Sequence, residues 1–220
     1  MDEETPIVLV APVPIVLKYD ITRTVNGRTN SSEGALLWRH DGTNYEARLE
    51  RSDFLTGSRT LTSTGRLTAN GLEPMRFEDI TVSTSVAQID REAGIVHFSP
   101  DSPDVALTFG AQDELSVIIQ LAAVFAGNTS RLPVGTTIAF QTIGSRSASR
   151  YAFIVGDSEL LTLPGGTVNA IHLELQSVEG HDGKMDLWLA PEQGYLPVRM
   201  LVSQNSGNYI DHQWRSTAAP

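Results

Sequence analysis

The residues whose types and spacing come nearest to a reactive site are His172, Glu174 and Asp186. His172 and Glu174 are two positions apart in a segment with strand character, so their side chains point to the same face. Asp186 on the following predicted strand is able to approach them. An imidazole beside two carboxylates suits a transition metal or acid–base catalysis. The sequence therefore predicts that any metal site lies here.

The alternative for this group is a structural role at the protein surface. The intervening positions are Ile171, Leu173 and Leu175, which have the character of a core-facing row. That orientation would leave His172 and Glu174 in solvent, without the supporting contacts that preorganise a site. We therefore expect no resident metal.

Motifs of known enzyme classes are missing from the sequence. It contains no Gly-x-Ser-x-Gly nucleophile elbow, no glycine-rich phosphate loop and no His-Glu-x-x-His pair. The absence of Cys excludes thiolate nucleophiles, Cys-ligated zinc, iron–sulfur clusters and disulfides. We expect no catalytic residues and no cofactor. An uncharacterised hydrolase remains an alternative, because residues distant in sequence can assemble a site on a β-sheet.

A second group of residues suits ligand binding. Trp188 and Tyr195 lie in or beside short apolar strands, where aromatic side chains pack in a core or stack on a ligand. Arg199 lies between Val198 and Met200, and a guanidinium that points into a concave face needs an acidic partner or an anionic ligand. We favour packing for the two aromatic residues and an internal ion pair for Arg199.

Composition narrows the range of partners. The chain has 220 residues, with 16 Lys and Arg against 26 Asp and Glu, and its formal net charge is -10. This charge repels phosphate backbones, so we expect no nucleic-acid partner. The apolar run at residues 6–17 is broken by prolines and is too short to span a bilayer, so we expect no transmembrane segment. The length suits one β domain with a substantial core.

Alternation of apolar and polar side chains predicts β-strands from about residue 15 onward. Turn pairs at Asn26-Gly27 and Asp41-Gly42 favour two-residue hairpins, because both central residues need positive φ. Another turn is predicted at Gly156-Asp157. The predicted strands are residues 15–22, 32–40, 45–50, 57–67, 76–84, 86–90, 95–98, 105–109, 137–143, 150–155, 168–178, 184–190, 198–203 and 208–215. The pattern indicates an antiparallel meander.

One segment, residues 113–126, breaks the strand pattern and predicts a helix. Its polar residues Asp113, Ser116 and Gln120 form one narrow stripe, and apolar side chains cover the rest of its circumference. A helix of this kind is buried or covered, so we place it against the concave face of a curved sheet. We expect replacement of Gln120 by Ala to have a mild effect.

These elements predict a mainly β fold. We expect a single antiparallel, strongly curved sheet or open barrel that wraps the apolar helix at residues 113–126. The predicted organisation is an extended lead-in or linker at residues 1–14, a single β domain at residues 15–216 and a C-terminal tail at residues 217–220.

Several motifs taken together resemble one bacterial family, DUF3108, over residues 15–215. They are Asp113-Glu114-Leu115-Ser116, Gln120-Leu121, Tyr151, Leu163-Pro164-Gly165-Gly166, Asp186-Leu187-Trp188-Leu189-Ala190-Pro191 and Tyr195-Leu196-Pro197-Val198-Arg199. The resemblance implies a secreted or envelope protein of Gram-negative bacteria, particularly proteobacteria. It also implies a periplasmic or outer-envelope location and a signal or anchor encoded ahead of this sequence. It carries over no enzymatic activity and no catalytic residue.

Two non-catalytic functions remain open beside the hydrolase. The favoured one is an envelope protein whose curved sheet and apolar helix hold a hydrophobic or lipid-like ligand or dock a protein partner. The alternative is a structural or scaffolding module with a dry core, whose function lies in its surface loops.

Overall fold

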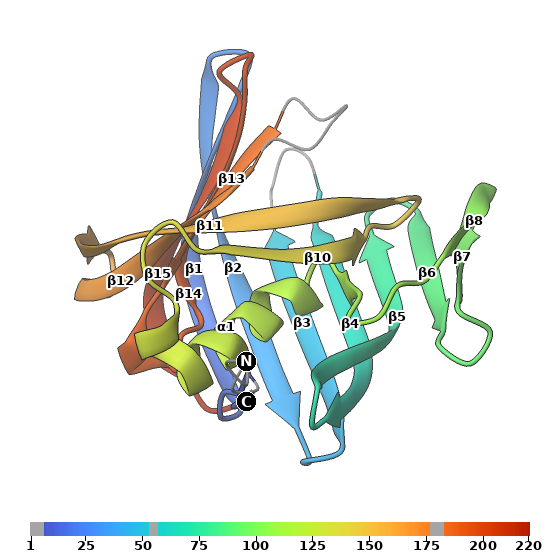
Figure 1. Cartoon of the computed structure of the whole chain (residues 1–220). Coiled ribbons are helices and arrows are strands. Elements are labelled where there is room, and N and C mark those ends of the chain that lie inside the picture. Colours follow the sequence, from blue (N-terminus) through green and yellow to red (C-terminus); the bar gives the residue numbers. More distant parts are fainter. Residues whose placement is uncertain (1–6, 53–56, 177–182) are drawn as a thin grey trace.

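The computed structural model describes residues 7–52, 57–176 and 183–220. In this part of the chain, one sheet of fifteen strands curves around a single α-helix (Figure 1). The strand order is β8-β7-β6-β5-β4-β3-β2-β1-β15-β14-β13-β12-β11-β10-β9, and the two edge strands do not pair with each other. The prediction of an open, strongly curved sheet around one helix is confirmed.

The first half of the chain supplies β1 (Ile15–Val25), β2 (Arg28–His40), β3 (Asn44–Ser52), β4 (Arg59–Thr68), β5 (Gly71–Ile80), β6 (Thr84–Asp90), β7 (Ile95–Ser99), β8 (Ser102–Ala106) and β9 (Gln112–Asp113). The helix α1 (Ser116–Asn128) and a short 3-10 turn, η1 (Thr129–Arg131), follow. The second half supplies β10 (Thr137–Ile143), β11 (Ala148–Leu163), β12 (Gly166–Leu175), β13 (Gly183–Leu189), η2 (Pro191–Gln193), β14 (Pro197–Gln204) and β15 (Tyr209–Ala218).

The sheet is almost entirely a meander. Successive strands pair antiparallel along each half of the chain, and β1 pairs with β15 to join the two halves. The exception to antiparallel pairing is β9, which adds two residues parallel to β10. The register of β1 and β15 places Ile21 opposite His212, so both ends of the chain contribute to the same inner surface.

The two predicted hairpin turns differ in outcome. Asn26 and Gly27 both have positive φ, 51° and 75°, and form the predicted two-residue hairpin. At the second turn, the backbone N–H of Asp41 donates to the carbonyl of Asn44, which makes Gly42 and Thr43 the central pair. The prediction of Asp41-Gly42 as that pair is therefore wrong by one residue. The carboxylate of Asp41 accepts hydrogen bonds from the backbone N–H groups of Thr43 and Asn44, which stabilises this arrangement.

Three other predictions change in the second half of the sheet and at its edge. Gly156-Asp157 is no turn, because β11 continues through it with a register irregularity between Val155 and Ser158. The strand predicted at residues 105–109 is observed as β8, which ends at Ala106. The predicted strand at residues 168–178 corresponds to β12, which ends at Leu175. The last two residues of the prediction lie outside the described part of the chain.

The helix begins three residues later than predicted. Residues 112–113 are the short strand β9, and Asp113 turns the chain into α1 by accepting hydrogen bonds from the backbone N–H groups of Leu115 and Ser116 at 2.9 and 2.6 Å. Both N–H groups lie at the helix start, where they lack partners within the helix. The acidic side chain therefore precedes the helix and satisfies its backbone.

Gln120 is not a tolerant surface position. Its side chain is buried, and its Oε1 accepts a hydrogen bond of 2.9 Å from the backbone N–H of Leu72 on β5. Replacement by Ala would leave this N–H without its partner, at a cost of about 1–3 kcal/mol. The expectation of a mild effect is therefore wrong, because the polar stripe of the helix faces a strand.

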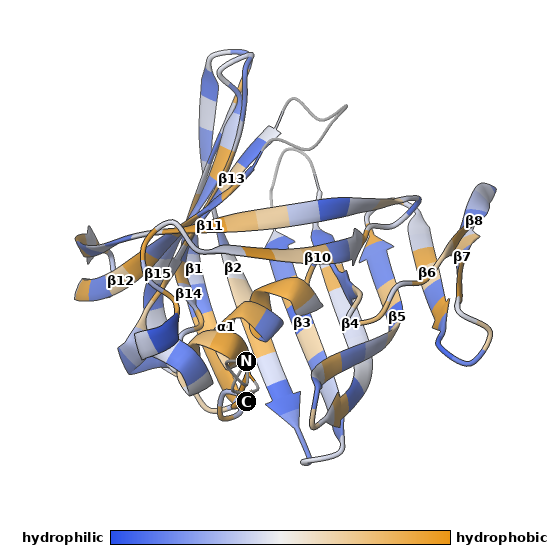
Figure 2. Ribbon diagram, in the orientation of Figure 1, coloured by the Kyte–Doolittle hydropathy of each residue, from blue (hydrophilic) through white to orange (hydrophobic). Residues whose placement is uncertain are grey.

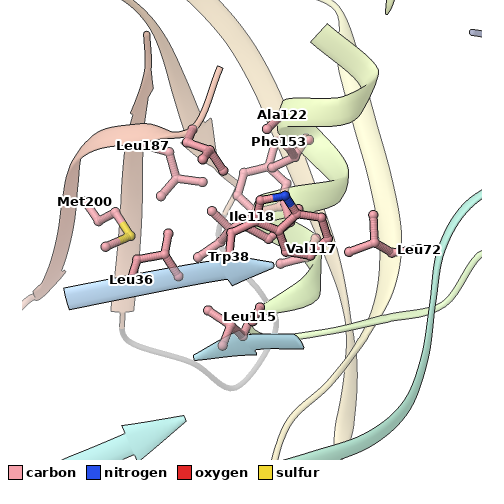
Figure 3. Close-up of a cluster of buried hydrophobic side chains, with 14 of the residues drawn as sticks. Leu36, Trp38, Leu72, Leu115, Val117, Ile118, Ala122, Phe153, Leu187 and Met200 are labelled. Atoms are coloured by element: carbon pink, nitrogen blue, oxygen red, sulfur yellow. The ribbon is translucent and has the colours of Figure 1, made fainter. Parts of the chain in front are cut away.

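The main core lies between α1 and the concave face of the sheet. Figure 2 shows the hydrophobic colour along α1 and alternating colours along the strands. In Figure 3, Leu115 and Ile118 at the start of α1 lie among Leu36 and Trp38 of β2 and Met200 of β14. The segment before β1 also contacts the helix, since the N–H of Val10 donates to the carbonyl of Ala123.

A smaller hydrophobic cluster lies on the outer face of the sheet. Trp188 alternates along β13 with Leu187 and Leu189, which belong to the main core, so its side chain points outward. It is 7% exposed because the end of the β11–β12 hairpin covers it. The backbone N–H of Gly165 at the tip of this hairpin donates to the carbonyl of Trp214 and holds the hairpin against β15.

Asp113 is a fully buried carboxylate, and burial raises its pKa to about 6. An acid with a raised folded-state pKa binds more protons in the folded than in the unfolded state between pH 3.8 and 6. Its contribution to stability is thus complete below pH 3.8 and is lost as pH rises through 6.

As pH rises from 4 to 6, ionisation of Asp113 should lower the free energy of unfolding of the unmodified protein by up to about 3 kcal/mol. We expect Asp113→Asn to lack this decrease. Asn can still accept from the N–H groups of Leu115 and Ser116 and can donate to the Ser63 hydroxyl that now donates to Asp113. Urea denaturation of both proteins across this pH range measures the difference. Parallel stability curves for the two proteins would contradict the assignment.

Candidate functional site

A cavity of about 310 Å³ lies beyond the N-terminal end of α1, between β3 and β4 on one side and β13 to β15 on the other. Most of its lining side chains are apolar: Leu49, Leu61, Leu115, Ile118, Met185 and Met200 are among them. In Figure 3, Leu115 and Ile118 lie at the start of the helix and Met200 lies across from them on β14. Its volume lies at the lower end of the range of small-molecule sites, about 300–1,000 Å³.

Five polar or charged side chains complete the wall of this cavity: Arg51, Arg59, Glu114, Tyr151 and His212. The two-residue period of a strand places Arg51 on the same face of β3 as Ala47 and Leu49, which belong to the core row. Arg59 lies directly opposite Arg51 on β4. Two guanidinium groups therefore enter the cavity wall side by side.

Arg59 forms a two-point ion pair with Asp79 of β5. Its Nε and Nη2 donate to the two carboxylate oxygens, each at 2.8 Å. The hydrogen bond to Asp79 raises the pKa of Arg59 despite partial burial. Glu114 adds negative charge that acts on Arg59 as well as on Tyr151. Burial first, and then this charge, raises the pKa of Tyr151 to about 12.

His212 is the most buried polar residue of the cavity, at 8% exposure. Its Nδ1 has no hydrogen-bond partner among the described residues. Burial, and to a lesser degree the charge of Arg51, lowers the pKa of this imidazole to about 4. The ring is thus neutral at pH 7 and has one unmet hydrogen bond, and leaving a buried polar atom unsatisfied costs about 1–3 kcal/mol.

The residues predicted as a metal site are only partly brought together. His172 Nε2 lies 2.7 Å from Asp186 Oδ1, and its Nδ1 lies 3.5 Å from Glu159 rather than Glu174. Glu174 is exposed. Among residues 7–52, 57–176 and 183–220, no group of three or more His, Asp or Glu side chains converges as metal ligands would.

Trp188 and Arg199, two of the predicted ligand-binding residues, lie on the outer face, away from the cavity. His172, Trp188 and Arg199 are register neighbours on β12, β13 and β14 and form one stacked row. The imidazole lies 4.7 Å from the indole at 14°, and the guanidinium lies 4.7 Å from the indole centre. Arg199 donates to both oxygens of Asp211, at 2.9 and 2.8 Å, so the predicted ion pair forms, but on the outer face and not in the concave face.

Tyr195 belongs to neither the outer row nor the cavity. It follows Gly194 in the turn after η2 and has a positive φ of 60°. Its ring stacks on Phe125 near the C-terminal end of α1, and its hydroxyl lies 2.8 Å from the hydroxyl oxygen of Thr129. The three predicted ligand-binding residues therefore do not form one site.

The sequence reasoning missed Arg51, Arg59 and His212. One signal was available for Arg51, because it continues the inward row of Tyr45, Ala47 and Leu49, and a charged residue on an apolar strand face is informative. Nothing comparable marks His212, whose partners in the wall come from strands distant in sequence.

The family model for DUF3108, described as a protein of unknown function, matches residues 18–210 of the chain. The chain belongs to the DUF3108 family. This agrees with the motifs identified in the sequence. No curated protein matches the chain.

Solved structures support the fold. The chain is similar to a β-barrel-like DUF1849 protein of Brucella abortus, with a TM-score of 0.62, 12% identity, and coverage of 96% of this chain and 99% of that one. A LolA superfamily protein of Nitrosomonas europaea has a TM-score of 0.36, 9% identity and coverage of 97% and 89%. A domain of Vibrio parahaemolyticus described as a "putative outer membrane lipoprotein-sorting protein domain" has a TM-score of 0.34, 8% identity and coverage of 94% and 85%. The last two superpose too loosely to support an argument.

None of the helices in the described part of this DUF3108 chain has the length and apolar character needed to cross a membrane.

The buried imidazole of His212 predicts a pH effect of opposite sign to that of Asp113. Its folded-state pKa of about 4 is below the ordinary value of 6.5, so the unfolded chain binds more protons in this range. Its stability contribution is present above pH 6.5 and is lost as pH falls through 4.

As pH rises from 4 to 6.5, His212 should raise the free energy of unfolding of the unmodified protein by up to about 3 kcal/mol. We expect His212→Leu to lack this increase. The two buried groups oppose each other, so the unmodified protein should have a flatter stability curve than either single variant. Urea denaturation of the protein, His212→Leu and Asp113→Asn across this pH range tests both signs. A His212→Leu curve parallel to that of the unmodified protein would contradict a buried neutral imidazole.

Proposed function

We propose that this DUF3108 protein is a non-catalytic binding protein that holds a small hydrophobic ligand in the cavity at the N-terminal end of α1. The observation that carries the proposal is the cavity itself, about 310 Å³ with mainly apolar walls. The apolar side chains of this hollow are accessible to water, and a ligand that fills it removes that apolar surface from water, which is favourable.

The composition of the wall supports binding over catalysis. Met185 and Met200 are unbranched and adapt to ligands of different shape, which is a common use of methionine at binding surfaces. Arg59 is engaged by Asp79, and His212 is neutral with no described carboxylate that would orient it as a base. We assign no catalytic residue to the cavity.

We also infer a location in the bacterial cell envelope, with a hydrophobic molecule or an envelope protein as the partner. The support is the family resemblance, which implies secreted or envelope proteins. The scaffolding alternative differs in one measurable respect, since a module with a dry core would bind no ligand.

The test of the proposed function uses a neutral apolar fluorophore, N-phenyl-1-naphthylamine, titrated against the purified full chain. We expect saturable binding that Met185→Trp abolishes, because the indole fills part of the cavity. Met75→Trp is the matched control, since Met75 is 37% exposed and does not line the cavity. Far-ultraviolet circular dichroism confirms that both variants fold.

Binding of the fluorophore that is equal in Met185→Trp and Met75→Trp would place the probe elsewhere and overturn the proposal. Native mass spectrometry of protein purified without detergent gives a second readout. A co-purified small molecule that organic extraction removes is expected from the unmodified protein and from Met75→Trp, and not from Met185→Trp.

A further inference from the structure

We infer that the natural ligand of the cavity is a single-chain carboxylic acid, whose head group contacts Arg51, Arg59 and His212 and whose chain follows the apolar wall. The inference rests on the proposed function and adds the chemical class of the ligand. Four observations carry it: the paired arginines, the orphan imidazole, the position of the acidic wall and the size of the cavity.

The two arginines are an unusual pair for adjacent strands. Arg51 and Arg59 are directly opposite each other in the β3–β4 ladder, on the face that lines the cavity. An anion placed between the two guanidinium groups is attracted by both of them. A guanidinium also presents a planar set of donors that matches a carboxylate.

His212 supplies the second, independent observation. It comes from β15, so its place in the wall owes nothing to the strands that carry the arginines. Its side chain is nine-tenths buried, and its Nδ1 has no hydrogen-bond partner in the described part of the chain. The charge of Arg51 acts on this ring, which indicates that the two side chains face a common space. A carboxylate held there accepts hydrogen bonds from the guanidinium of Arg51, and from His212 in the tautomer that carries its proton on Nδ1.

Acidic residues define which end of the cavity receives the head group. Asp79 engages Arg59 through Nε and Nη2 and does not line the cavity. Glu114 does line it, but its carboxylate lies by Gly144, where an added Cβ would be 2.8 Å from Oε1. Glu114 repels an anion from its own position by Gly144, which leaves the space between Arg51 and His212 for the head group.

The size of the cavity favours one chain over two. A volume of about 310 Å³ lies at the lower limit of small-molecule sites. Apolar side chains such as Leu61, Leu115 and Met185 supply the rest of the wall, which gives a single hydrocarbon chain a surface to contact. A diacyl phospholipid has two chains and a larger head group, and we expect it to bind poorly.

The experiment compares dodecanoate with dodecanol, two probes with the same chain and different heads. Isothermal titration calorimetry with the full chain at pH 7.5 should give an affinity for the acid roughly ten- to hundredfold higher than for the alcohol, as expected for charge-assisted hydrogen bonds. Arg51→Gln should remove this difference, because it should weaken binding of the acid and leave binding of the alcohol unchanged.

Arg48→Gln is the matched control, because Arg48 lies on the same strand, on the opposite face, in an exposed ion pair with Glu50. It should retain the full preference for the acid. His212→Leu should also weaken the acid more than the alcohol. Far-ultraviolet circular dichroism verifies the fold of each variant.

The outcomes separate this inference from the proposed function. Equal affinities for dodecanoate and dodecanol, with N-phenyl-1-naphthylamine still bound, would overturn the carboxylate assignment and leave the hydrophobic cavity standing. Tighter binding of a single-chain lysophospholipid than of the acid would overturn the carboxylate assignment and indicate a phosphate head group instead. Failure of all these probes to bind would overturn the proposed function and the inference together.

Discussion

The structure depends on the burial of a helix that is apolar around almost its whole circumference. Such a helix cannot leave one side in water, so the sheet must curve around it and the N-terminal segment must cover what the sheet leaves open. Three buried polar side chains attach it to its surroundings. Asp113 contacts Ser63 of β4, Gln120 contacts β5 and Asn128 contacts the backbone of Val8. These contacts set the position of the helix along the concave face.

The cavity follows from where the helix begins. Asp113 ends a two-residue strand and starts α1 within three positions, so no helical turn covers the inner ends of β3 and β4 or of β13 to β15. The walls left there contain charged and polar side chains, which are uncommon in a dry core. Arg51, Arg59 and His212 face a volume that the apolar side chains of α1 do not fill.

The outer face shows why reactive residue types need not make a reactive site. His172, Trp188 and Arg199 stack in one row across three strands, and carboxylates on neighbouring positions satisfy their polar atoms. The row buries an indole and fixes the register of β12 to β14 on the side away from the core. Each polar group already has a protein partner, so the row offers little to a ligand.

Local pattern alone determined the strand content, the buried helix and the Asn26-Gly27 hairpin, because alternation, helical periodicity and turn chemistry act over a few residues. It also determined that Leu173 and Leu175 face the core while Glu174 faces solvent. The tertiary structure decided what those elements meet. Gln120 is buried because β5 crosses its face, and His212 lines the same cavity as Arg51 because the last strand pairs with the first. These contacts join residues far apart in the chain, and their geometry depends on the curvature and register of the whole sheet, which no local pattern encodes.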